Sequence, residues 1–136
     1  MGTCREGTDA RGLRVLIADD NRDYADSLAI LLRLLGHEAS VAYNGQTALR
    51  MAPALQPHVV LLDLAMPGLN GYEVARQLQA LPGFAAVILA LTGYADNNHQ
   101  QRGQGLFQDY LIKPIEFGDL EQRLTRLRDG AALACA

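Results

Sequence analysis

Short apolar runs that each end at a polar residue recur along this chain, and segments with helical spacing separate them. Val59 to Leu62 stops at Asp63, and Val15 to Ala18 stops at a pair of aspartates. Continuous apolar runs of this kind indicate buried parallel strands, with helices covering both faces of the sheet. We therefore expect an α/β fold with strands over residues 15–18, 38–43, 59–63, 87–91 and 109–112.

Helical periodicity predicts the connecting segments. Asn21 is a typical N-cap, and Gly36 stands where a helix would end. We expect helices over residues 22–35, 46–54, 72–81, 95–104 and 117–127, with the second closed by prolines 53 and 57. The segment 95–104 is poor in helix formers and is the weakest of them. The last helix places four apolar residues on one face: Phe117, Leu120, Leu124 and Leu127.

Length and composition fit one globular domain. The chain has 136 residues, of which 49% are hydrophobic, and a chain of this size buries enough surface for its own core. We expect a flexible N-terminal tail over residues 1–12, the domain over 13–128 and a C-terminal tail over 129–136.

Charge and hydropathy argue against two classes of protein. The net charge is −3 and the arginines are scattered, whereas nucleic-acid binding needs a basic patch. The longest apolar run, Phe84 to Leu91, is far shorter than the roughly 20 residues of a membrane span, and the N-terminus lacks the apolar core of a signal peptide. We expect a cytoplasmic protein without direct nucleic-acid binding or membrane insertion.

Isolated cysteines and histidines are interpreted as incidental: Cys4, Cys135, His37, His58 and His99.

The polar residues that end the strands point to chemistry. Asp19 and Asp20 follow the first strand, Asp63 ends the third, Thr92 the fourth and Lys113 the fifth. Ligands of open parallel sheets bind at the carboxyl ends of the strands, so these side chains are expected at one edge. Clustered carboxylates favour Mg²⁺, and a carboxylate beside a metal, an ammonium and a hydroxyl suits phosphoryl transfer, including an aspartyl phosphate.

Taken singly, each of these signals is also typical of ordinary structure. An Asp-Asp pair can be a helix cap, Thr92-Gly93 a turn and Lys113-Pro114 the end of a strand. Their ordered occurrence at successive strand ends favours a site. Lys113 is the only lysine beside 11 arginines, which suggests that this position needs a compact charge.

The ordered motifs resemble the receiver domain of two-component response regulators. They are VLIADDNRDYADSLAILLRLLGHE, LLDLAMPGLNGYE, LALTGYA and DYLIKP, and the likeness covers residues 13–128. These sequence motifs are most similar to those of receivers attached to, or working beside, hybrid histidine kinases. The resemblance implies a flavodoxin-like, doubly wound, five-stranded parallel sheet of order 2-1-3-4-5.

The resemblance also implies roles for the acidic residues. Asp63 would accept the phosphoryl group. Asp20, Asp63 and the backbone carbonyl of Ala65 would bind Mg²⁺ (or Mn²⁺) directly, and Asp19 would act through water. The partners would be a histidine kinase or histidine phosphotransfer protein and an output partner that the sequence does not name.

The same resemblance assigns the remaining residues. Lys113 would pair with the phosphoryl oxygens, Thr92 would hydrogen-bond them, and Tyr110 would move as Thr92 moves. Ala65 and Tyr94 would flank the phosphoryl group and tune its lifetime. The output face would be the fourth helix, fifth strand and fifth helix.

Two other functions remain as alternatives. A Mg²⁺-dependent phosphatase with an aspartyl nucleophile would need a second Asp two residues after Asp63, where Ala65 stands. A degenerate receiver would serve only as a docking module. The sequence leaves open the kinase, the stimulus, the oligomeric state and whether the chain is a single-domain regulator or a piece of a hybrid kinase.

Overall fold

Five parallel strands form a single sheet in the computed structural model, which describes residues 12–66, 71–93 and 106–135. The sheet order is β2-β1-β3-β4-β5, so the flavodoxin-like order expected from the sequence is confirmed. The strands are β1 (Arg14–Ala18), β2 (Glu38–Ala42), β3 (Val59–Asp63), β4 (Val87–Thr92) and β5 (Asp109–Ile112).

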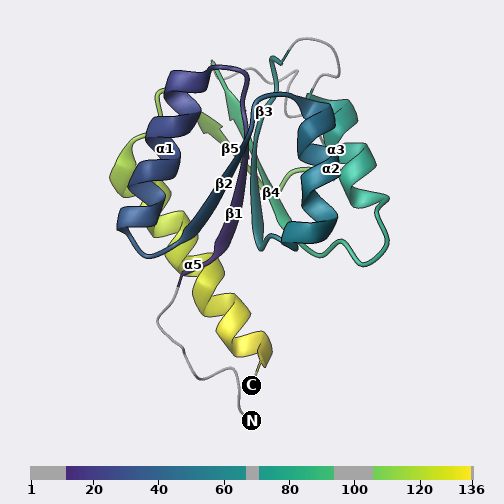
Figure 1. Cartoon of the computed structure of the whole chain (residues 1–136). Coiled ribbons are helices and arrows are strands. Elements are labelled where there is room, and N and C mark those ends of the chain that lie inside the picture. Colours follow the sequence, from purple (N-terminus) through teal and green to yellow (C-terminus); the bar gives the residue numbers. More distant parts are fainter. Residues whose placement is uncertain (1–11, 67–70, 94–105, 136) are drawn as a thin grey trace.

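The described helices cover both faces of this sheet, as expected. Helices α1 (Arg22–Leu34) and α5 (Phe117–Cys135) lie on one face, and α2 (Gly45–Leu55) and α3 (Gly71–Gln79) lie on the other (Figure 1). The helix expected over 95–104 falls outside the described residues. Of the helices in the described ranges, none combines the length and the apolar character needed to cross a membrane.

Alternating side chains of the strands point to opposite faces of the sheet and pack in two separate cores. Ile17 and Leu61 point to the face covered by α1 and α5, whereas Leu16 and Leu62 point to the face covered by α2 and α3. All four are fully buried. Because both faces are covered, the central strands are apolar from Val15 to Ala18 in β1 and from Val59 to Leu62 in β3, and this produced the continuous runs in the sequence.

Side-chain caps fix where the first two helices begin. The Asn21 side chain accepts a hydrogen bond from the Tyr24 amide at 3.1 Å, and Asn44 does the same for Thr47 at 2.8 Å. After α1, Gly36 takes a left-handed conformation with φ of 97°, which glycine adopts at little cost. The predicted boundaries of α1 are therefore confirmed, and its N-cap, Asn21, directly follows Asp20.

Three helix boundaries and one packing assignment differ from the prediction. Helix α2 continues through Pro53 to Leu55, because the buried Ala52 keeps its last turn packed and the turn closes with a Gln56 to Ala52 hydrogen bond. Helix α3 covers Gly71–Gln79 instead of 72–81.

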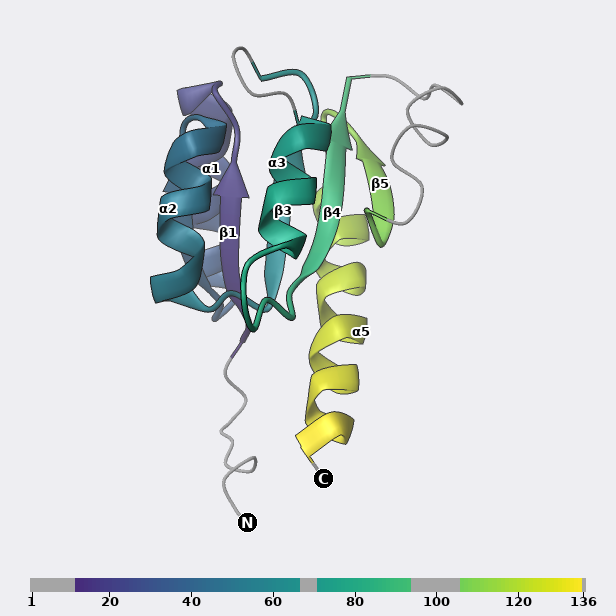
Figure 2. The same ribbon diagram turned by 90° about the vertical axis from the view of Figure 1, so that its right-hand side faces the viewer.

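Helix α5 and its first residue also depart from the expectation. The helix continues to Cys135, past the point where a tail was expected, since the alanine-rich sequence there has high helix propensity. Figure 2 shows its last turns extending below the lower ends of the strands. Phe117 is 39% exposed, whereas Leu120 and Leu124 are buried, so the packed face begins one turn later than predicted.

Two histidines that the sequence analysis took as incidental hold the start of β1. Nδ1 of His37 accepts a hydrogen bond from the Leu13 amide, and Nδ1 of His58 accepts one from the Arg14 amide, both at 2.9 Å. Burial lowers the pKa of both imidazoles. The nearby Arg128 adds to this effect at His37, and Arg14 adds to it at His58. A protonated Nδ1 could not accept either bond.

The histidine contacts predict a loss of stability in acid. With a lowered pKa in the folded state, each imidazole stabilises the fold above the unfolded-state pKa of about 6.5, and this stability is lost as the pH falls below that value. The double variant His37→Asn/His58→Asn keeps an acceptor that does not titrate. Urea unfolding should show a smaller drop in its midpoint between pH 7.5 and 5.5 than in the wild type. Parallel pH dependence of the two proteins would contradict this role.

Candidate functional site

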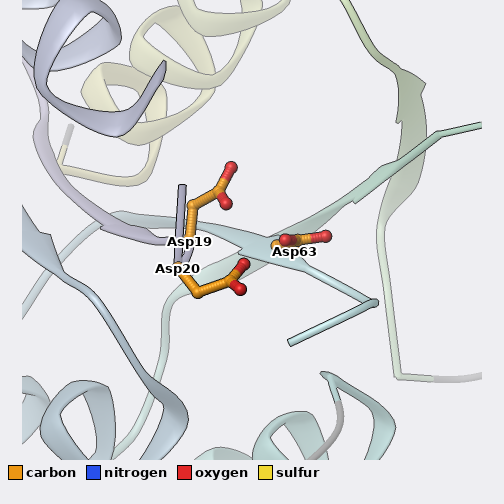
Figure 3. A group of neighbouring side chains, drawn as sticks. All are labelled: Asp19, Asp20 and Asp63. Atoms are coloured by element: carbon orange, nitrogen blue, oxygen red, sulfur yellow. The ribbon is translucent and has the colours of Figure 1, made fainter. Parts of the chain in front are cut away.

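Three carboxylates meet where β1 and β3 end. Asp19 and Asp20 follow β1, and Asp63 is the last residue of the neighbouring β3. Each offers one oxygen, and these oxygens all lie within 4.8 Å of one another. Figure 3 shows the two consecutive aspartates side by side, with the Asp20 carboxylate pointing toward Asp63 on the next strand. The structure therefore brings together the acidic residues that the sequence placed at one edge.

Backbone amides orient two of the three carboxylates. Oδ1 of Asp19 accepts a hydrogen bond from the Asn21 amide at 3.0 Å, and Oδ1 of Asp63 accepts one from the Ala65 amide at 3.1 Å. In both cases the donor lies two residues further along the chain, in an Asx-type turn. One oxygen of each carboxylate is thus fixed, and the other is left for different contacts.

The second oxygen of each of these carboxylates faces Lys113. Its Nζ lies 2.8 Å from Oδ2 of Asp19 and 3.5 Å from Oδ2 of Asp63. The residue follows β5, and its amide donates to the Thr92 carbonyl at 2.7 Å, which continues the β4–β5 pairing up to the site. The Lys113 side chain therefore reaches from the end of β5 to the end of β1.

Burial and negative charge dominate the electrostatics of this edge. Asp63 is only 5% exposed, and burial raises its pKa to about 6; the Ala65 N–H bond and Lys113 oppose the rise, while Asp19 adds to it. Burial by itself would lower the pKa of Lys113, but Asp19 and Asp63 outweigh it, so its pKa is raised. Of the three clustered carboxylates, the Lys113 ammonium contacts two, those of Asp19 and Asp63. The remaining negative charge favours a hard cation such as Mg²⁺.

The other predicted residues lie around this centre. Thr92 is buried at the end of β4. Tyr110 is half-buried on β5 and packs edge-on against Phe107, with ring centroids 5.4 Å apart; Phe107 in turn meets Tyr72 at 5.9 Å. Tyr94 falls outside the described residues.

Two residues that shape the site were missed by the sequence analysis. A Cβ on Gly71 would lie 2.8 Å from the Asp63 carbonyl oxygen and 2.7 Å from Cα of Leu64, so only glycine lets α3 begin so close to the end of β3. Its signal was a glycine at the start of a predicted helix, inside the Asp63 motif. The second residue, Tyr24, has no local sequence signal. Its hydroxyl contacts the amide of Ile115, which lies 91 residues further along the chain.

Comparison with known proteins places this arrangement in a family. The model of the response regulator receiver domain matches residues 15–125, which includes the polar residues at the carboxyl ends of the strands and all of the five strands except Arg14. The chain belongs to the response regulator receiver family. The likeness expected from the four sequence motifs is therefore confirmed.

Curated relatives of this receiver domain are larger proteins. It is 38% identical over 117 residues to the DNA-binding response regulator MtrA of Mycobacterium tuberculosis (strain ATCC 25618 / H37Rv), covering 85% of this chain and 50% of that protein. It is 39% identical over 103 residues to a response regulator receiver protein of Anaeromyxobacter sp. (strain Fw109-5), covering 75% and 43%. The chain thus spans about half the length of the curated relatives it matches.

Solved receiver structures share the fold closely. A CheY-like receiver domain from Methylobacillus flagellatus is 29% identical with a TM-score of 0.79, covering 87% of this chain and 99% of that one. The receiver domain of sensor histidine kinase PA1611 from Pseudomonas aeruginosa PAO1 is 28% identical with a TM-score of 0.79, covering 87% and 98%. That second structure has a magnesium ion coordinated in its active site cleft.

The raised pKa of Asp63 predicts that Asp63→Asn stabilises the metal-free domain at neutral pH. The folded pKa of about 6 lies above the unfolded value, so the folded state holds the extra proton and wild-type stability falls as the pH rises from 4 through 6. Above that range the variant should be more stable by about 1 kcal/mol, since solvent at the rim screens part of the penalty.

Thermal or urea unfolding without divalent cation, at pH 4 and pH 7.5, measures this difference. The advantage of Asp63→Asn should be largest at pH 7.5 and should vanish toward pH 4. A wild-type domain that is the more stable of the two at pH 7.5 would show that Asp63 is not under electrostatic strain.

Proposed function

We propose that this receiver domain accepts a phosphoryl group from a phosphohistidine onto Asp63. One observation carries the proposal. Asp63 is a nearly buried carboxylate with one oxygen held by the Ala65 amide and the other facing the Lys113 ammonium at 3.5 Å. A nucleophile for phosphoryl transfer needs this fixed orientation and a cation beside the oxygen that reacts.

The reaction would exchange one bond to phosphorus for another. A carboxylate oxygen of Asp63 attacks the phosphorus atom, the new P–O bond forms as the P–N bond of the donor breaks, and the imidazole leaves and takes up a proton. Bound Mg²⁺ (or Mn²⁺) would supply positive charge for the phosphoryl oxygens. Asp20, Asp63 and the Ala65 carbonyl would hold it, with Asp19 acting through water.

Exposure supports this division between the two neighbouring aspartates. Asp19 is completely buried, and its oxygens meet the Asn21 amide and Lys113. Asp20 is exposed, and its carboxylate has no ion pair or hydrogen bond within the described ranges. An exposed carboxylate loses little when a cation replaces its water, so Asp20 suits direct ligation.

The two neighbouring aspartates should differ in their effect on metal affinity. Asp20→Asn should weaken Mn²⁺ or Mg²⁺ binding about tenfold or more, because a direct charged ligand is lost. Asp19→Asn should weaken it less, although it removes the same charge one residue away. Electron paramagnetic resonance of Mn²⁺, with Mg²⁺ as competitor, measures both affinities. Equal losses, or a larger loss for Asp19→Asn, would reverse the assignment.

Signal readout would pass through the residues at the ends of β4 and β5. In this proposal Lys113 pairs with the phosphoryl oxygens, Thr92 hydrogen-bonds them, and Tyr110 follows the movement of Thr92. The Lys113 amide bond to the Thr92 carbonyl links these two residues, and the pairing of Tyr110 with Ala90 joins Tyr110 to the strand that Thr92 ends. Ala65 and Tyr94 would set how fast the phosphoryl group is hydrolysed.

A histidine kinase or phosphotransfer protein would supply the phosphoryl group, and an output partner would bind the face that includes β5 and α5. MtrA is a DNA-binding protein by name, but this chain covers only half of it. The acidic edge and the net charge of −3 favour a switching role for this segment and not direct contact with DNA. Ala65 at the second position after Asp63 disfavours the phosphatase alternative.

Phosphorylation by a small donor tests the proposed function. Incubation with acetyl phosphate and Mg²⁺ should add one phosphoryl group to the wild-type chain, measured by intact mass, and Asp63→Asn should abolish the addition. Omitting the divalent cation should slow it strongly. The same mass increase in Asp63→Asn would place the nucleophile elsewhere, and no increase in the wild type would favour a docking module.

A further inference from the structure

Tyr24 on α1 contacts the segment after β5 at two points, the Ile115 amide and the Lys113 ammonium. Its hydroxyl accepts a hydrogen bond from the Ile115 amide at 3.3 Å. Its ring faces the ammonium of Lys113, whose Nζ lies 4.9 Å from the ring centroid. Because Ile115 is two residues after Lys113, this single side chain contacts both the backbone and the charged end of the segment.

The ring adds a third partner to the ammonium. Asp19 and Asp63 contact Nζ at 2.8 and 3.5 Å, and the half-buried ring of Tyr24 lies within the distance of about 6 Å at which a cation is attracted to an aromatic face. A lysine side chain is long and flexible, so two carboxylates alone leave it several rotamers. An aromatic face also carries no charge with which to compete for a metal ion.

We propose that Tyr24 is a positioning residue for phosphoryl transfer, which holds the Lys113 ammonium over Asp63 before a donor arrives. The inference rests on the proposed function and extends it to a residue outside the acidic set. The ring places the ammonium, and the hydroxyl fixes the backbone from which Lys113 projects. The two contributions are separable, since Tyr24→Phe removes only the hydroxyl whereas Tyr24→Leu removes both.

A spectroscopic test follows directly from the composition. Lys113 is the only lysine in the chain, so protein labelled with ¹³C at the lysine ε-carbon gives one signal without assignment. The aromatic ring should shift the attached ε-protons upfield in the wild type and in Tyr24→Phe, and Tyr24→Leu should remove this shift. In Tyr24→Phe, the ¹⁵N-bound amide proton of Ile115 should move upfield as its hydrogen bond is lost.

A kinetic test uses a small phosphodonor, which needs no protein docking surface on α1. With phosphoramidate and Mg²⁺, Tyr24→Leu should slow phosphorylation about fivefold, and Tyr24→Phe should restore the rate to within about twofold of the wild type. Mn²⁺ affinity should stay within about twofold in both variants, because neither contact involves a carboxylate.

Tyr43 provides a matched control. Its hydroxyl donates to Asp26 and its ring lies 4.1 Å from the guanidinium carbon of Arg22. Like Tyr24 it combines a hydroxyl hydrogen bond with a cation–π contact, but its partners are both on α1 and no contact with Lys113 is among those of the described residues. Tyr43→Leu should leave both the lysine signal and the phosphorylation rate unchanged. An equal slowing by Tyr43→Leu and Tyr24→Leu would trace the effect to α1 packing and overturn the inference.

Two outcomes separate this inference from the proposed function. A wild-type chain that takes up no phosphoryl group would overturn the phosphoacceptor role, and with it the transfer step that Tyr24 is proposed to serve. A wild type that is phosphorylated at the same rate as Tyr24→Leu, with an unchanged lysine signal, would overturn only the role of Tyr24.

Discussion

The ion pair between Lys113 and Asp19 ties together two strand ends that are not neighbours in the sheet. Strands β3 and β4 lie between β5 and β1 in the order of the sheet, yet Nζ of Lys113 reaches Asp19 Oδ2 at 2.8 Å. The long lysine side chain therefore passes over the end of β3, where Asp63 stands. The proposed phosphoryl transfer depends on that reach, because it puts the positive charge of Lys113 beside the candidate nucleophile.

The carboxyl ends of the strands, where the acidic cluster lies, destabilise the metal-free fold. Contacts at the amino end of β1 stabilise it. Three carboxylates within 4.8 Å repel one another, and burial raises the pKa of Asp63. At the other end of β1, by contrast, neutral imidazoles accept hydrogen bonds from successive amides, and the strands between are buried on both faces. Among the residues that the structure describes, this electrostatic strain lies at the edge where a metal ion and a phosphoryl group are proposed to bind, as is usual for functional sites.

Most of the fold and the acidic set could be predicted because their signals are local. The alternation of apolar strands and helices, the cap at Asn21 and the polar residues at the ends of four of the strands all follow from short stretches of sequence. Errors arose where packing overrides a local preference. Pro53 did not end α2, since the buried Ala52 holds the turn, and Phe117 lies outside the packed face of α5.

Contacts between distant segments set the limit of the sequence analysis at the site itself. Gly71 has a close contact with Asp63 that depends on how α3 approaches β3, and the contact of Tyr24 with Ile115 joins residues 91 positions apart. His37 and His58 read as isolated residues because their partners are backbone amides. A backbone partner leaves no pattern of residue types in the sequence, so only the fold could show these roles.

The geometry of the site explains why the chain has a single lysine, Lys113. Eleven arginines serve elsewhere in the chain, and a planar guanidinium presents its donors in a rigid fork that suits one carboxylate in a bidentate pair. The position after β5 instead needs a donor that meets Asp19, Asp63 and the face of Tyr24 from one point. An ammonium is compact and rotates freely about its stem, so it can satisfy three partners arranged around it. The arrangement of Asp19, Asp63 and Tyr24 around Nζ therefore gives a physical reason why a chain that otherwise uses arginine has a lysine here.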